Sequence, residues 1–376
     1  MADRIEQIVA KLPDQKSVTG VWEVAERHLA LGDAAFLADL GIALAGVYGS
    51  DASRIRQYGS VFDYLLRLLA TTPGPDHVAE ALRLVSGTET ADSDLDRYAA
   101  SLLASSHPVE ELAVAFTGEA SEELRACLVH ELVLRGADVT QAPGVARWAM
   151  SPHWSYHPLG WLPLALSDVE GQPDLPSYSA RGGSHSMPYG SPANGEVRAD
   201  AGTRVPSVEE TTTQAAAKGI GTAVANWAEE SNGRIEARVF GLAAPLGAES
   251  LPGMLLGLGL ECLKGAGKKK TTFSVAACPP DQAWSVLFAA ASTGGAYSSG
   301  ARGAYGRLAA WQSLAGLSGV AGGSPVEEVE QRARECTWYG FGAGTKWFEH
   351  VAWDIGLASL SPERRRLAVL AATDTD

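Results

Sequence analysis

The sequence predicts an α+β protein: an all-helical N-terminal bundle or short helical array, then a C-terminal α+β domain with a mainly antiparallel sheet. Three observations support this prediction. Apolar residues recur three and four apart in residues 1–150, Pro, Gly and Ser cluster in residues 151–206, and helical and alternating patterns mix in residues 207–376. We therefore expect an all-helical domain, a linker or long loop, and an α+β domain that ends in a three-stranded antiparallel meander.

The helical prediction rests on spacing and on breaks between segments. Leu65, Leu66, Leu68 and Leu69 show the helical spacing, and no stretch of useful length alternates. Breaks such as the Pro-Gly-Pro at residues 73–75 separate helices of about a dozen residues. These short helices and loops predict a bundle or a short solenoid.

The middle segment, residues 151–206, has the composition of neither a helix nor a central strand. Two interpretations stay open for it, a linker or a loop packed over a neighbouring element. Its tyrosines and His185 favour keeping the second interpretation, because linkers seldom carry aromatic side chains.

The C-terminal part mixes both periodicities. A capping box at Ser207–Glu210 predicts a helix to about Glu230, and the clean alternation of residues 234–240 predicts a strand. The remaining predicted elements are a helix over 251–264, a strand over 271–277, helices beginning at Pro280, Tyr305 and Ser324, and three terminal strands.

Residues 347–357 are predicted to form one strand with an apolar core face. His350 and Asp354 share its other face, roughly 13 Å apart at strand rise, so they cannot bond to each other directly. Any catalytic role would use His350 as general base, oriented by Asp354 or by Glu349, which interrupts the apolar face.

A glycine- and hydroxyl-rich segment, residues 292–307, is the best candidate for small-molecule binding. Close helix packing is the competing interpretation of its glycines. It contains no Gly-x-Ser-x-Gly motif, which argues against an ordinary serine hydrolase. The predicted ligand-binding residues are Ser292, Thr293, Tyr297, Ser298 and Arg302.

No cofactor or metal is expected. Gly267-Lys268 is followed by lysine and precedes a predicted strand, whereas a phosphate loop follows a strand and continues with Ser or Thr. His153 and His157 are four residues apart, but flanking prolines leave barely one helical turn for a metal site. A metal protein that uses these two histidines together with His185 is the weaker alternative.

The charge is negative and uneven. The formal net charge is −14; residues 1–148 hold 12 basic and 22 acidic residues (net −10), and residues 149–376 hold 18 and 22 (net −4). Such a surface repels nucleic acid and anionic membranes. We interpret Lys268–Lys270 and Arg364–Arg366 as solvated turns, and Asp374 with Asp376 as an exposed acidic end.

The compartment is expected to be the cytoplasm. The N-terminus has no basic region followed by an apolar one, and the longest apolar run, residues 251–260, is too short to span a bilayer. The four cysteines are scattered without a C-x-x-C pair, so we expect reduced, mostly buried thiols.

Four segments carry a family resemblance: Gly233–Phe240, Ala291–Tyr297, Trp347-Phe348 with Trp353–Leu357, and Leu370–Asp376. They resemble an uncharacterised actinobacterial family, domain of unknown function 6183, mainly after Pro206. The resemblance implies an actinobacterial source and an α+β core, and it transfers no catalytic residue.

Two functions are compared. The first is a protein-binding or regulatory role, of which an immunity-like role is one form, in which the acidic helical half meets a protein partner. The second is an enzyme or small-molecule binder with its site between residues 292–307 and the polar face of the terminal sheet. The sequence favours the first and leans away from an enzyme, because no catalytic motif fits.

Overall fold

The fold is α+β, as predicted: a helical N-terminal region precedes an antiparallel sheet of six strands. The structure is a computed structural model that describes residues 2–51, 55–88, 93–186, 188, 206–267, 271–350 and 352–375. The chain divides into two compact units. Unit 1 comprises Met1–Gly160 and Leu175–His185, and unit 2 comprises Trp161–Asp174 and Ser186–Asp376.

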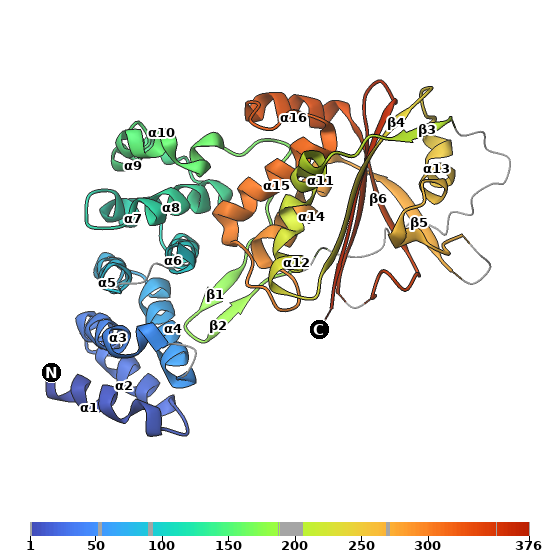
Figure 1. Ribbon diagram of the computed structural model, residues 1–376. Coiled ribbons are helices and arrows are strands. Elements are labelled where there is room, and N and C mark those ends of the chain that lie inside the picture. Colours follow the sequence, from blue (N-terminus) through green and yellow to red (C-terminus); the bar gives the residue numbers. More distant parts are fainter. Residues whose placement is uncertain are drawn as a thin grey trace. The chain divides into compact units, whose positions relative to one another are not determined.

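Unit 1 is an array of helices (Figure 1). The helix α3 packs against α1, α2, α4 and α5, then α4 packs against α6, and α6 packs against α8. Contacts that pass from neighbour to neighbour in this way are typical of a helical array. The helices are α1 (Ala2–Lys11), α2 (Thr19–Ala30), α3 (Ala34–Tyr48), α4 (Arg56–Thr71), α5 (Pro75–Ser86), α6 (Ser93–Ser106), α7 (Val109–Leu112), α8 (Glu122–Leu134), α9 (Pro143–Trp148) and α10 (Pro152–Tyr156).

Side-chain caps and prolines set several helix starts in unit 1. Asp33 accepts a hydrogen bond from the amide of Phe36 at the start of α3, and Ser121 accepts one from the amide of Leu124 at the start of α8. Pro75 occupies the first turn of α5, where a missing N–H leaves no bond unmade.

A short hairpin completes unit 1, built from β1 (Ser177–Ser179) and β2 (Gly182–Ser184). The Tyr178 hydroxyl lies 3.0 Å from Ser101 Oγ on α6, and Arg67 Nε of α4 donates to the Ala180 carbonyl at 3.1 Å. A tyrosine of the Pro/Gly/Ser-rich segment therefore anchors a folded element onto the array.

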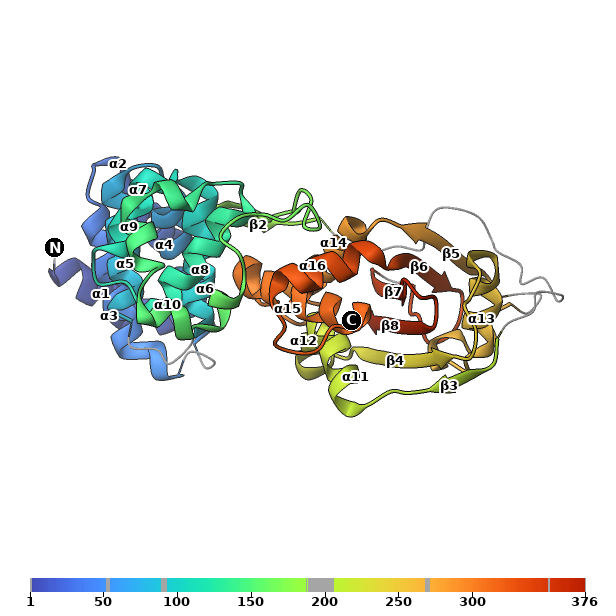
Figure 2. The same cartoon turned by 90° about the horizontal axis from the view of Figure 1, so that it is seen from above.

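Unit 2 contains the six-stranded sheet, in the order β3-β4-β8-β7-β6-β5 (Figure 2). Every neighbouring pair is antiparallel. The central strand β8 is buried in all but its first residue. The strands are β3 (Val208–Glu210), β4 (Arg234–Leu242), β5 (Phe273–Cys278), β6 (Thr337–Ala343), β7 (Trp353–Leu360) and β8 (Arg366–Asp374).

Helices cover both faces of this sheet (Figure 1). On one face α11, α14 and α15 contact strands β4, β6, β7 and β8. On the other face α13 contributes Met254 and Leu255 to a core with Leu367, Val369 and Ala371 of β8. The helices are α11 (Gln214–Gly221), α12 (Ala225–Glu230), α13 (Leu251–Gly257), α14 (Pro280–Thr293), α15 (Arg302–Ser318) and α16 (Val326–Glu335).

Three sequence predictions for unit 2 are wrong. Residues 208–210 form β3, and the helix begins only after Thr213, whose hydroxyl accepts from the amide of Ala216. The helix predicted over 251–264 ends at Gly257, two residues before Gly259 with its positive φ of 68°. Residues 347–350 precede β7 as a loop, in which His350 also has a positive φ, 57°.

A fully buried ion pair holds the first segment of unit 2 in place. Arg307 of α15 donates through Nε and Nη2 to the two carboxylate oxygens of Glu170, at 2.5 and 2.8 Å. Its guanidinium also donates to the carbonyls of Pro163 and Ala165. The indole of Trp311 adds a further donor to Glu170 at 2.9 Å. This set of partners is what makes two buried charges tolerable.

We expect Arg307→Ala to lower the free energy of unfolding by about 3–5 kcal/mol, because Glu170 would stay buried without its counter-charge. The control is Arg334→Ala. Arg334 pairs with Asp168 of the same segment, but both side chains are exposed, so its loss is expected below about 1 kcal/mol. Urea denaturation followed by tryptophan fluorescence compares the two. Equal losses would contradict the role given to the buried pair.

Candidate functional site

The predicted ligand-binding residues lie in and beside the turn that joins α14 to α15. The Thr293 hydroxyl donates to the Ala289 carbonyl of its own helix at 2.7 Å, and Ser292 is buried. Arg302 begins α15 with a positive φ of 62°. Tyr297 is 63% exposed. The hydroxyls of the helix end therefore serve the helix itself, and Tyr297 is the group turned to solvent.

Buried Asp374 fixes this turn. Its Oδ2 accepts from the Ala296 amide at 2.7 Å, and its Oδ1 accepts from the Ser231 hydroxyl and from the Thr375 amide, each at 2.9 Å. Within the turn, Ser298 Oγ accepts from the Gly295 amide at 2.7 Å. Asp374 is 1% exposed, so the prediction of an exposed acidic position there is wrong. Asp376 lies outside the described residues.

The predicted catalytic residues form contacts that hold the loop before β7 in its conformation. Asp354 accepts from the backbone amide of His350 at 2.9 Å and from the Thr373 hydroxyl at 2.6 Å. Glu349 forms an ion pair with Arg234 of β4. The contact between His350 and Asp354 thus runs through the main chain, where the expected strand geometry excluded a direct bond.

The sheet separates these two groups of residues. Thr373, which contacts Asp354, and Asp374, which contacts the 294–298 turn, are neighbours on β8. Neighbouring strand residues point to opposite faces. The structure therefore does not bring the two groups together on one face, and their roles in catalysis and ligand binding stay predictions.

The three histidines considered as metal ligands, His153, His157 and His185, lie in different environments. His157 Nδ1 accepts from the Leu159 amide at 3.2 Å, which leaves Nε2 to donate to Glu123 at 3.0 Å. His153 and His185 are exposed. Within the part of the chain that the structure describes, no three His, Cys, Asp or Glu side chains form a group that could hold a metal ion.

The cysteines are free thiols. Burial is the main cause that raises the pKa of all four, and it raises that of Cys278 to about 11. A thiol with a raised pKa carries little of the thiolate that reacts as a nucleophile or binds a metal at neutral pH.

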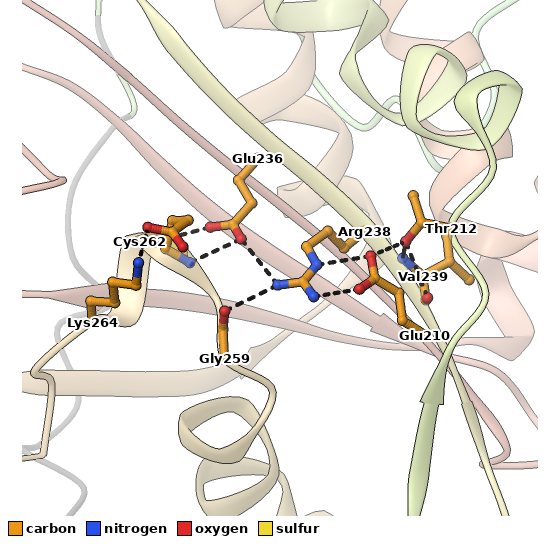
Figure 3. A network of polar contacts seen from close by, with 9 residues as sticks. Glu210, Thr212, Glu236, Arg238, Val239, Gly259, Cys262 and Lys264 are labelled. Atoms are coloured by element: carbon orange, nitrogen blue, oxygen red, sulfur yellow. Dashed lines mark hydrogen bonds and ion pairs between the residues drawn. The ribbon is translucent and has the colours of Figure 1, made fainter.

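A network of charges runs along β4 on the α13 side of the sheet (Figure 3). Arg238 donates to both carboxylate oxygens of Glu210 on β3, at 3.0 and 2.5 Å, and to the Gly259 carbonyl at 3.1 Å. This pairing lowers the pKa of Glu210 and raises that of Arg238. Glu236 accepts from the amides of Glu261 and Cys262, each at 2.9 Å. The network ties the edge strand and the residues after α13 to the sheet.

An exposed set of side chains lies at the end of the array in unit 1. Arg147, Met150, His153 and Tyr156 recur at every third position on α9, α10 and the connection between them, and all four are exposed. Met150 is 81% exposed and Tyr156 is 90% exposed. We call these four residues the α9–α10 corner.

Next to these residues in the sequence are two buried tryptophans, Trp148 and Trp154, which pack in an aromatic cluster with His130. The rings of Trp148 and Trp154 are 5.3 Å apart, and those of Trp154 and His130 are 5.4 Å apart. The Trp148 indole also donates to Glu122 at 2.7 Å. Sequence reasoning singled out His153 here and missed Met150 and Tyr156, because their spacing does not show that they are exposed.

Together these features define an α+β protein with a helical array in one unit and a six-stranded antiparallel sheet in the other. Its described helices include none long and apolar enough to cross a membrane. The chain belongs to the family of unknown function DUF6183, whose model matches residues 19–376. The match covers nearly the whole chain, so the expectation of a resemblance mainly in the C-terminal half was too narrow. Neither the curated proteins nor the solved structures contain a match.

We expect Asp374→Asn to destabilise unit 2 by about 1–3 kcal/mol. Both carboxylate oxygens of Asp374 accept hydrogen bonds, and in asparagine an NH₂ group replaces one of them and faces a donor. Glu349→Gln, at an exposed ion pair, is the control and should change stability by less than about 1 kcal/mol. Thermal unfolding measures both. A neutral Asp374→Asn would show that the 294–298 turn does not depend on this carboxylate.

Replacing Arg238 tests the network at the β3 edge. We expect Arg238→Lys to speed amide exchange in residues 208–212 several-fold, because lysine keeps the charge but loses the two-pronged contact with Glu210. Arg234→Lys, whose partner Glu349 lies in the loop before β7, should leave that exchange unchanged. Hydrogen–deuterium exchange with mass spectrometry distinguishes the two, and identical profiles would count against the network.

Proposed function

We propose that this protein is a cytoplasmic, non-enzymatic binding protein that holds a protein partner at the α9–α10 corner and thereby has a regulatory role. One observation carries the proposal: Met150 and Tyr156 stand 81% and 90% exposed next to buried, mutually packed tryptophans. Side chains this exposed contribute little to the packing of their own unit, and in an interface they would bury apolar area.

The residue types support a protein as the partner. Tyrosine, methionine and arginine are enriched in protein–protein interfaces, and tyrosine and arginine are frequent among the residues that dominate binding energy. An aromatic cluster fixed by ring contacts and by the bond from Trp148 to Glu122 limits the entropy lost on binding.

The charge distribution supports a partner with a basic surface. Residues 1–148 carry a net charge of −10, from 12 basic and 22 acidic residues. This acidic part of unit 1 attracts a positively charged protein over a distance and repels nucleic acid and anionic lipid. The corner itself offers Arg147 and His153, so direct contacts there would favour apolar groups and carbonyl or carboxylate oxygens.

Two observations support a binding role in the cytoplasm. The conspicuous polar groups of unit 2, among them Asp374, Asp354 and Arg307, have hydrogen bonds that the fold itself needs. All four cysteines are free thiols, which suits a reducing compartment.

The experiment compares proteins retained from a lysate of the source organism by three immobilised chains: wild type, Tyr156→Ser and Leu31→Ser. Leu31 is the matched control, because it is 77% exposed in unit 1 but lies after α2. We expect one protein that wild type and Leu31→Ser retain equally and that Tyr156→Ser retains at least tenfold less, the loss of about 1.4 kcal/mol of binding free energy.

The retained protein is then purified and titrated against the same chains, with Met150→Ser added. Equal affinity of all four chains would place the contact elsewhere. The absence of any protein that discriminates Tyr156→Ser from wild type would contradict the proposal.

A further inference from the structure

The two edges of the sheet in unit 2 differ in kind (Figure 2). At one edge β3 has three residues, Val208–Glu210, and two of them are glutamates. Short, charged strands are how sheets avoid pairing with other chains. At the other edge β5 has six residues, Phe-Ser-Val-Ala-Ala-Cys, without charge or proline. The second edge lacks the protection that the first one has.

The ladder between β5 and β6 shows which main-chain groups face outward. The amide of Gly344 donates to the Thr272 carbonyl at 2.9 Å, so this pair and every second pair after it are hydrogen-bonded. The N–H and C=O groups of Phe273, Val275 and Ala277 therefore point away from β6. Among the residues that the structure describes, none forms a hydrogen bond with these outward groups.

We propose that β5 pairs antiparallel with β5 of a second copy of this chain, which joins the two sheets. The inference is independent of the proposed function. A two-fold axis through Val275 aligns all three outward residues of both copies. It sets Phe273 opposite Ala277 of the partner subunit, and each outward N–H then faces an outward C=O of the other copy. The main-chain groups of this edge are thus complementary to themselves.

The charge distribution favours the β5 edge over other surfaces of this chain as the place where two copies meet. Two copies of a chain with net charge −14 repel each other, and the repulsion is least where no carboxylate lies near the contact. Neither β5 nor its neighbour β6 contains a charged residue. A strand edge of six residues covers less than the roughly 1,200 Å² of a stable interface, so the dimer should dissociate on dilution.

The test is sedimentation velocity of the full chain from low micromolar to sub-millimolar concentration. We expect a monomer–dimer equilibrium. Ala277→Pro should weaken it at least tenfold, because proline removes an outward N–H and leaves the bonds to β6 intact. Ala277 is exposed, and the matched control Ala277→Ser keeps the N–H and should behave as wild type.

A second variant tests the same contact in case Ala277→Pro does not fold. Ala277→Glu keeps the backbone donor but adds a carboxylate from each copy to a contact without other charges, so it should also weaken the dimer. A wild-type chain that is monomeric at every concentration would overturn the proposal. So would a dimer that survives both Ala277→Pro and Ala277→Glu, or one that Tyr156→Ser dissociates while both Ala277 variants stay dimeric.

Discussion

The buried ion pair of Arg307 and Glu170 is the constraint on which the packing of unit 2 depends. A guanidinium without water must have its donors satisfied, and here a carboxylate and two carbonyls, all from residues 163–170, satisfy them. Because α15 packs against α11, α14 and α16 and contacts β7 and β8, the closed packing of these layers requires the segment that neutralises Arg307. An apolar core alone would not require that particular segment.

The sequence could predict what depends on local periodicity. The alternation of residues 234–240 identified β4, and helical spacing identified α4. It could not show what depends on distant partners. Arg307 stood in a segment interpreted as a ligand site, and its partner lies 137 residues earlier among prolines and glycines. The loop before β7 looked like a strand because its residues alternate, whereas the left-handed backbone of His350 is decided by the bond to Asp354.

The candidate site shows the same division. The alternation of residues along a strand correctly predicts the face of the sheet to which each side chain points. It does not predict the order of the strands, which determines the side chains that lie beside it on that face. Thr373 and Asp374 stand side by side in the sequence and serve opposite sides of the sheet. The α9–α10 corner escaped prediction for a different reason. Exposure of Met150 and Tyr156 is a property of the packed array, and nothing in their spacing alone distinguishes an exposed apolar stripe from a buried one.

The path of the chain has a consequence for how this protein can change during evolution. Residues 161–174 belong to unit 2 and residues 175–185 return to unit 1, so the chain crosses between the units three times. No single recombination point can then transfer either unit intact: a break before residue 161 removes the hairpin that Ser101 and Arg67 hold, and a later break takes Glu170 away from Arg307. The two units are therefore expected to be inherited together, which agrees with a family match that spans both.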